Sequence, residues 1–285
     1  MTAAQIAQQE NKTWTICLPM KPPMSNRLSL HISPCPNDTF VFHALIHNLV
    51  DTEGLAFDVQ FEDIETLNQH AIAGVGDVVK ASVAIAKMVD YTMLDSGAAL
   101  GYGNGPIVVR RVGSDPQSTL KIAVPGMHTT AALLFRRYFP ENNNIIAVPF
   151  RSIAPMVARG EADWGVLIHE GRFTFGELGL DKVADLGQLW EAEMGLPIPL
   201  GAIFASNRLD PDTIKKVERT IARSTIYALN NRTASAEFVR SHAGELSPKV
   251  LEQHIDYFVT DFTRSLSERG RQAIATLLAR EAPTK

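Results

Sequence analysis

The feature that most constrains the fold is an order of segments that occurs twice along the chain. Each copy is expected to run strand, helix, strand, helix, and to end with a glycine, an aspartate three residues later, and a further strand. The glycine and aspartate are Gly74 and Asp77 in the first copy, and Gly160 and Asp163 in the second. Such a repeat predicts two similar α/β lobes instead of one continuous sheet.

The first copy follows from the spacing of apolar residues. Residues 28–32 (LSLHI) and 55–61 (LAFDVQF) alternate apolar and polar side chains, as strands with one buried face do. Between them, one apolar helical face consists of Val41, Ala44, Leu45 and Leu49. Asn37 or Asp38 is expected to cap this helix, because a short side-chain oxygen can accept from first-turn amides. Strand, helix and strand together favour a parallel crossover.

The second copy repeats this order, with strands expected at 120–124 and 145–150 around a helix. Ser82 and His169 then end the third strand of each copy. Because ligands bind beyond the carboxyl ends of parallel strands, both side chains are expected to face a cleft between the lobes.

The chain is expected to cross between lobes at the glycine-rich segment 96–111 and to return at 195–205. Four helical segments are expected after that, packed on the first lobe: 211–230, 234–243, 248–262 and 267–280. The predicted division is a first lobe of residues 28–110 plus 203–285, a second lobe of residues 111–202, and a disordered extension of residues 1–27. The alternative is that the protein starts at Met24 and that the first 23 residues result from an upstream start.

Composition narrows the partners. Lys and Arg total 27 against 31 for Asp and Glu, so the net charge of −4 gives no basic surface for nucleic acid or an anionic membrane. The sequence contains no uninterrupted run of about 18 apolar residues, so no membrane-spanning helix is expected. Cys17 and Cys35 are too few for a disulfide framework, and the first 23 residues make a poor secretory signal. A cytoplasmic protein is expected, with its oligomeric state left open.

Residues 33–40 (SPCPNDTF) join the first strand to its helix. Pro34 and Pro36 fix two backbone angles and remove two amide donors, so this loop is expected to be rigid. Asn37 then stands where first-turn amides could hold an anion. The alternative is a capped turn without a ligand.

Residues 125–131 (PGMHTTA) form the matching turn of the second lobe. Gly126 allows close backbone approach, and Thr129 or Thr130 supplies a hydroxyl. Two helix N-termini would then face one cleft and bind an anionic small molecule. The alternative is that one threonine merely caps its helix.

His169 is the candidate general base. It ends an apolar strand, where its imidazole can be desolvated and still reach the cleft, and its titration range suits proton transfer near neutral pH. A structural histidine is the alternative. Glu170 would point to the opposite face of a strand, unless the strand has already ended.

Other chemistries have weaker support. Cys35 lacks a nucleophile signature. His43 and His47 lack the HExxH pattern or a paired ligand, which favours a solvated or half-buried helix face. The segment 101–105 (GYGNG) precedes a strand instead of opening a helix, and no Walker loop occurs. We therefore expect neither a metal nor a nucleotide cofactor.

A resemblance to a known family adds to these patterns. It is carried, in order, by SPCPNDTFVFHAL (33–45), EDIETLN (62–68), VVKAS (78–82), VPGMHTTA (124–131), VLIHEGRFTF (166–175) and GLPIPLGAIFA (195–205). The chain resembles the 1,4-dihydroxy-6-naphthoate synthases of the futalosine route to menaquinone, from Leu28 to the C-terminal helices. This resemblance implies the two-lobed α/β fold of periplasmic binding proteins, type II, with an active-site cleft between the lobes.

The resemblance also implies a function. The expected enzyme is a carbon–carbon lyase that uses no cofactor and converts cyclic dehypoxanthine futalosine into 1,4-dihydroxy-6-naphthoate and a sugar-derived fragment. His169 matches the family's proton acceptor. The residues that would line the substrate site are Lys80, Ser82, Thr130 and Ala131, with Leu200 as an apolar contact; Asn37 joins them from the reading of residues 33–40.

Two alternatives remain open. Chorismate dehydratase is thought to share the fold and the pathway, but residues 33–40 and 128–131 argue against it. A solute receptor on the same scaffold should be exported, and the poor secretory signal argues against that reading.

Overall fold

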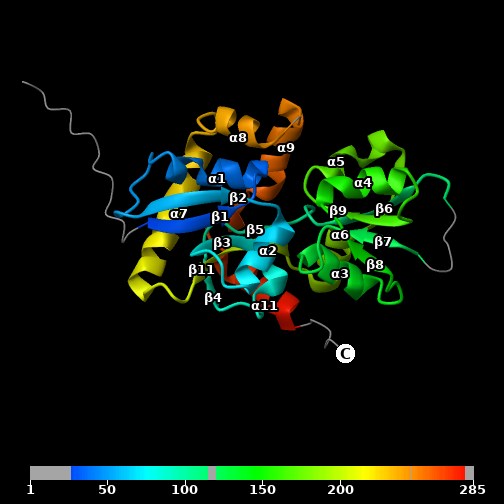
Figure 1. The fold of residues 1–285 in the computed structure, drawn as a ribbon, viewed down its shortest axis with the longest axis horizontal. Coiled ribbons are helices and arrows are strands. Elements are labelled where there is room, and N and C mark those ends of the chain that lie inside the picture. The colour runs from blue at the N-terminus through cyan, green and yellow to red at the C-terminus, as the bar shows by residue number, and fades with distance from the viewer. Residues whose placement is uncertain (1–26, 115–119, 245, 280–285) are drawn as a thin grey trace, which may run out of the picture.

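The computed structural model describes residues 27–114, 120–244 and 246–279, which form two lobes side by side (Figure 1). The predicted disordered extension therefore lies outside the described residues, apart from Arg27. Within the described ranges, no helix is long and apolar enough to cross a membrane.

The first lobe is built on a six-stranded sheet with the order β2-β1-β3-β11-β4, in which β5 also pairs with β11. Its strands are β1 (Arg27–Ile32), β2 (Ala56–Phe61), β3 (Val78–Ser82), β4 (Tyr91–Met93), β5 (Ala99–Gly101) and β11 (Ile198–Ser206). Its helices are α1 (Pro36–Ile46), α2 (Ile64–Ile72), η2 (Val83–Ile85), α7 (Pro211–Asn230), α8 (Ala236–His242), α9 (Pro248–Phe258), α10 (Asp261–Arg264) and α11 (Ser267–Ala279). As predicted, the C-terminal helices pack on this lobe, with α7, α8 and α9 against α1.

The second lobe is built on a five-stranded sheet with the order β10-β6-β9-β7-β8. Its strands are β6 (Ile107–Arg111), β7 (Ile122–Val124), β8 (Ile145–Ala147), β9 (Trp164–Leu167) and β10 (Leu180–Asp185). Its helices are α3 (Thr130–Tyr138), α4 (Phe150–Ala158), α5 (Gly171–Thr174), η3 (Phe175–Leu178) and α6 (Leu186–Met194).

The predicted repeat is present in both lobes. The order β2-β1-β3 of the first sheet matches β8-β7-β9 of the second, and all four pairings within these two sets are parallel. The glycines that end α2 and α4 are alike as well, because Gly74 and Gly160 have φ values of 71° and 75°. Only glycine adopts this left-handed conformation without steric cost, which explains the residue type at both positions.

The two aspartates of the repeat, Asp77 and Asp163, make equivalent hydrogen bonds in their lobes. The Asp77 carboxylate accepts from the amide of Ser29 in β1 at 2.9 Å, and that of Asp163 accepts from the amide of Lys121, just before β7, at 2.7 Å. Each aspartate therefore ties the chain leading into its lobe's third strand to the first strand of that lobe.

The chain passes between the sheets earlier than the predicted lobe limits. β6 pairs with β9 and β10, so residues 107–110 belong to the second sheet, and β11 already belongs to the first sheet from Ile198. The glycine-rich segment 101–105 is itself the crossing, and the strand after it pairs in the second lobe. Apolar spacing along the chain predicts a strand there but does not tell which sheet it joins.

The start of α1 differs from the prediction. Cys35, without a side-chain hydrogen bond, is the N-cap, and Pro36 is the first helical residue. The amides of Asp38 and Thr39 both donate to the Cys35 carbonyl, at 3.1 and 3.0 Å. Pro36 suits the first position because it has no amide hydrogen to leave unpaired. The predicted Asn37 or Asp38 cap is therefore wrong, and the amides of Asp38 and Thr39 are not open to an anion.

Apolar packing continues from one lobe into the other. One buried cluster runs from β3, β11 and η2 of the first lobe to α3 and α6 of the second. Separate clusters lie between β1, α1 and α7, and between β6 and α4. The shared cluster places the N-terminus of α3 against β11, which is where the site lies.

Candidate active site

A cleft between the lobes encloses about 660 Å³ of empty space, including space open to solvent. It is lined by the loop before α1, the end of β3, the crossing segment, the N-terminus of α3, the loop after β9, β11 and α9. All seven predicted site residues lie in its wall: Asn37, Lys80, Ser82, Thr130, Ala131, His169 and Leu200.

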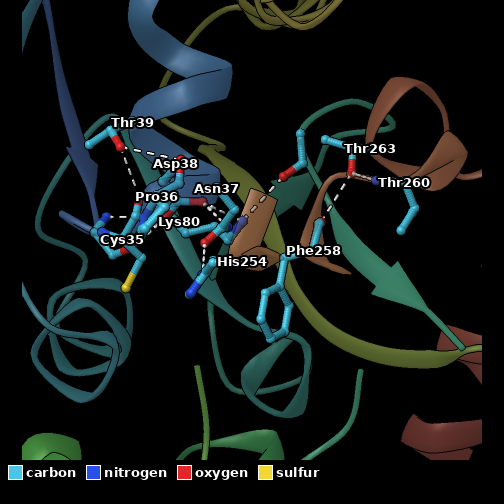
Figure 2. A network of polar contacts seen from close by, with 12 residues as sticks. Cys35, Pro36, Asn37, Asp38, Thr39, Lys80, His254, Phe258, Thr260 and Thr263 are labelled. Atoms are coloured by element: carbon cyan, nitrogen blue, oxygen red, sulfur yellow. Dashed lines mark hydrogen bonds and ion pairs between the residues drawn. The ribbon is translucent and has the colours of Figure 1, made fainter. Parts of the chain in front are cut away.

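A buried polar network occupies the first-lobe wall of the cleft (Figure 2). Lys80 Nζ donates to Asp38 Oδ1 at 3.0 Å and to the Gly97 carbonyl at 3.2 Å. Asp38 also accepts from Ser33 Oγ at 2.7 Å and from Asn37 Nδ2 at 2.8 Å. The ammonium group of Lys80 has three donors, so one remains for a ligand. Its charge, however, is already balanced by Asp38.

Ser82 is held by a second amide side chain. Asn68 Nδ2 donates to Ser82 Oγ at 3.1 Å, and Asn68 Oδ1 accepts from the Ser82 amide at 2.8 Å. Because Ser82 Oγ accepts from Asn68, its own hydrogen is free to donate into the cleft.

The N-terminus of α3 offers amide donors. Thr129 is the N-cap, because its hydroxyl accepts from the Ala132 amide at 3.1 Å. Among the described residues, the amides of Thr130 and Ala131 have no hydrogen-bond acceptor, as is usual in a first helical turn. Two free amides at the positive end of a helix favour an anionic group of a ligand.

The Thr130 hydroxyl lies between the two lobes. It donates to the Leu200 carbonyl of β11 at 2.9 Å and accepts from the Ala84 amide at 3.4 Å. These bonds fix the start of α3 against the first lobe, so this hydroxyl positions the neighbouring amides.

The turn before α3 is joined to α2 of the other lobe. Glu65 accepts from His128 Nδ1 at 2.6 Å and from the His128 amide at 3.2 Å. Gly126 has φ 144°, and an added Cβ would overlap the Glu65 carboxylate. The close approach that Gly126 permits is therefore made by Glu65 across the cleft.

His169 lies two residues beyond the end of β9 and has a left-handed backbone, with φ 52°. Its side chain is partly exposed, and its Nδ1 is buried without a partner, which leaves Nε2 as the nitrogen that can meet a ligand. Burial lowers the pKa of His169, and the nearby carboxylates of Glu170 and Asp38 offset part of that effect. The ring is therefore neutral near pH 7, as a general base must be.

Glu170 lies outside the strand, because β9 ends at Leu167. Its carboxylate is 3.5 Å from Arg151 Nε on α4. The strand has therefore already ended before Glu170, so its side chain is not forced to the face opposite His169. The two residues influence each other through charge and not through a hydrogen bond.

The comparisons with known proteins agree with this arrangement. A model of the menaquinone biosynthesis family matches residues 28–282. The chain is 42% identical to 1,4-dihydroxy-6-naphthoate synthase of Thermus thermophilus, over 88% of this chain and 93% of that protein. It is 41% identical to the enzyme of the same name from Streptomyces coelicolor, over 90% and 94%. The chain belongs to the 1,4-dihydroxy-6-naphthoate synthase family.

Solved structures confirm the predicted fold of this naphthoate synthase family member. A crystal structure of an Archaeoglobus fulgidus protein superimposes with a TM-score of 0.84 at 31% identity, over 90% of this chain and 97% of that one. The alkanesulfonate-binding protein SsuA of Xanthomonas axonopodis reaches 0.62 at 14% identity, over 82% and 84%. At that identity the likeness concerns the fold alone, which is that of the periplasmic binding proteins.

The surroundings of Cys35, His43 and His47 bear on the other chemistries that the sequence of this family member offers. Burial raises the pKa of the Cys35 thiol to about 12, so the thiolate that a nucleophile needs is not formed near neutral pH. The rings of His43 and His47 contact each other in a tilted arrangement, with centroids 4.5 Å apart and an angle of 38° between the planes. Within the described part of the chain, no group of three or more His, Cys, Asp or Glu side chains is arranged to hold a metal ion.

Sequence patterns missed several residues of this site, among them His254, Phe258 and Asn104. His254 on α9 hydrogen-bonds to Asn37, and Phe258 one turn later lines the cleft. Asn104 also lines it, with Oδ1 buried and without a partner among the described residues. Asn104 lies in the glycine-rich segment that predicts the crossing between the lobes. Nothing in the sequence marks His254.

Proposed function

We propose that the protein is a lyase that converts cyclic dehypoxanthine futalosine into 1,4-dihydroxy-6-naphthoate in menaquinone biosynthesis. The observation that carries the proposal is the neutral imidazole of His169 in the wall of a cleft that also presents two free helix amides, in a chain of this family. The neutral ring supplies a base, and the amides supply a place for the substrate's carboxylate.

Binding is the first task of the cleft. The carboxylate would lie at the amides of Thr130 and Ala131, and the Ser82 hydroxyl and the remaining donor of Lys80 line the same cleft from the first lobe. Because Lys80 is balanced by Asp38, the amides and hydroxyl carry most of the attraction for the anion. Leu200 contributes an apolar contact beside them.

Proton transfer is the second task. With the substrate held across the two lobes, Nε2 of His169 removes a proton, and ring opening with carbon–carbon cleavage follows, which releases the naphthoate and a sugar-derived fragment. Formation of the aromatic naphthoate supplies the driving force. The protein therefore needs to orient the substrate, exclude water and move protons, and we propose that it does so without a cofactor.

The test is turnover by the purified protein. The protein is incubated with cyclic dehypoxanthine futalosine without added cofactor, and 1,4-dihydroxy-6-naphthoate is followed by absorbance and mass. We expect product, and we expect His169→Ala to lower kcat by about a hundredfold or more with little change in substrate binding, because general-base catalysis contributes about that much.

The matched control is His47→Ala, because His47 is an exposed histidine whose ring contacts that of His43 and which does not line the cleft. It should keep the wild-type rate. Tight binding without product would point instead to a receptor. Dehydration of chorismate, with no reaction of the futalosine compound, would establish the other enzyme of the pathway. An unchanged rate in His169→Ala would remove His169 from its role.

A further inference from the structure

A second histidine lies against the proposed base from the opposite lobe. His254, on α9, is fully buried, and its ring is stacked on that of His169 with centroids 5.6 Å apart and an angle of 12° between the planes. α9 packs on α1 of the first lobe, whereas His169 follows β9 of the second. The stack therefore crosses the boundary between the lobes, where α9 faces α5 in Figure 1.

Hydrogen bonds fix the tautomer of His254 (Figure 2). Asp38 can only accept, and it is paired with Lys80. Asn37 must therefore point its NH₂ group at Asp38, which leaves its Oδ1 to accept from His254 Nε2 at 3.0 Å. His254 carries its hydrogen on Nε2, and its Nδ1 is a bare lone pair without a partner among the described residues.

The charged groups around the stacked pair determine which of the two histidines can carry an added proton. Burial lowers the pKa of His254 well below its ordinary value, and the neighbouring His169 lowers it further. The charged groups that face the pair are Asp38, Lys80, Arg151 and Glu170. Each carboxylate is matched by a cation, Asp38 by Lys80 and Glu170 by Arg151. A proton taken from a ligand is then expected to stay on His169, the ring that meets the cleft.

The ring of His169 depends on its neighbours for its orientation. Its left-handed backbone is unusual for a residue with a side chain, and its Nδ1 makes no hydrogen bond that would fix the ring. Instead, Phe150 meets it edge to face at 5.1 Å, and Phe258 packs against both histidines. His254 is the only stacked wall among these described contacts, so its loss would open a space beside the base.

We propose that His254 is a positioning residue: its neutral ring, locked as the Nε2–H tautomer by Asn37, holds His169 in place and leaves the transferred proton to His169 when the lobes are together. This inference rests on the proposed role of His169 as the base. Asp38, which is paired with Lys80, orients the Asn37 amide that fixes the tautomer of His254. The buried ion pair of the first lobe therefore contributes to the geometry of a base on the second.

Two substitutions separate the parts of this arrangement. His254→Phe keeps a stacked ring and loses the hydrogen bond, whereas His254→Gln keeps a donor for Asn37 and loses the ring. We expect kcat to fall by about tenfold in His254→Gln and less in His254→Phe, with KM nearly unchanged, because a small displacement of a reacting group is costly. Water entering beside His169 should also raise its pKa, which moves the acid limb of the kcat/KM profile to higher pH. His47→Gln, in a histidine pair outside the cleft, is the control and should leave kcat and the pH profile unchanged.

Nuclear magnetic resonance of ¹⁵N-histidine protein provides a readout that needs no turnover. In the wild type, His254 should remain the neutral Nε2–H tautomer from pH 5 to 8, and His169 should titrate at higher pH in His254→Gln. An Nδ1–H tautomer, a titration of His254 in that range, or wild-type kcat and pH profile in His254→Gln would overturn the proposal. If wild type forms no naphthoate, the proposed function fails, while these spectra still decide whether His254 controls His169. If His254→Gln does not fold, His254→Phe and the wild-type tautomer carry the test.

Discussion

His169 shows how one residue can be prepared for proton transfer by its surroundings. Its backbone adopts a conformation that costs about 1–3 kcal/mol for a residue with a side chain, and packing on both sides must hold it there. Burial, not a hydrogen-bonded carboxylate, keeps its ring neutral. A base of this kind is ready near neutral pH and needs no partner on Nδ1.

The pH dependence of the reaction follows from the lowered pKa. Only neutral His169 can accept a proton, so kcat/KM should fall as pH drops through a midpoint below the ordinary histidine value of 6.5 and should be level above it. The measurement is kcat/KM from pH 5 to 8.5. The residual activity of His169→Gln serves as the control and should lack this limb. A midpoint above 7 would contradict the assignment.

At the scale of elements, α2 and the turn before α3 form a contact between the lobes. Glu65 bonds twice to His128, and Gly126 leaves room for the carboxylate. The Thr130 hydroxyl makes a second link, from α3 to β11. Both links lie at the N-terminus of α3, whose amides are proposed to bind the substrate. The same turn therefore forms the contact between the lobes and the proposed anion site.

Weakening this contact should weaken binding more than chemistry. Glu65→Gln removes the charge of a hydrogen-bond acceptor that contributes about 1.5–3 kcal/mol, and we expect KM to rise by about tenfold with kcat within about twofold. Steady-state kinetics provide the measurement. Glu53→Gln, which removes a carboxylate paired with Arg219 outside the cleft, should leave KM as it is. An unchanged KM in Glu65→Gln would mean that this contact does not hold the lobes for the substrate.

At the scale of the whole molecule, the folded protein keeps several histidines from protonation. The pKa is lowered, chiefly by burial, for His31, His43, His169 and His254. In the unfolded chain these groups take up protons near pH 6.5, whereas in the folded protein they do so only at lower pH. Unfolding therefore binds protons below that pH, so the stability that neutral histidines provide is complete above 6.5 and is lost as pH falls.

We expect the free energy of unfolding to decrease from pH 7.5 to 5.5, a range above the ordinary titration of carboxyl groups. Urea unfolding at both pH values measures it, with fluorescence and circular dichroism compared to show whether the lobes unfold together. The control is His254→Phe, which removes one of the four groups and should show a smaller decrease. Equal stability at both pH values in the wild type would contradict this expectation.

Local patterns were sufficient where structure depends on neighbours in the chain. The alternation in residues 28–32 and 55–61 predicted β1 and β2, and the range 211–230 predicted α7. Where two local effects compete, prediction failed: the proline at position 36 begins α1 two or three residues earlier than a capping Asn37 or Asp38 would. Apolar spacing also predicts Leu49 on the buried face of this helix, but α1 ends at Ile46 and Leu49 is exposed.

The sequence by itself determined the repeat, the parallel crossovers and the strand end at Ser82, because hydrophobic period and glycine conformation act over a few residues. The predicted strand end at His169 was wrong, because β9 ends at Leu167. Only the tertiary structure decided that His254 lies on His169, that Glu65 fills the space beside Gly126, and that β6 joins the second sheet. These contacts join residues far apart in the chain. Their energies depend on distance in space and burial, which no pattern of neighbouring residues records.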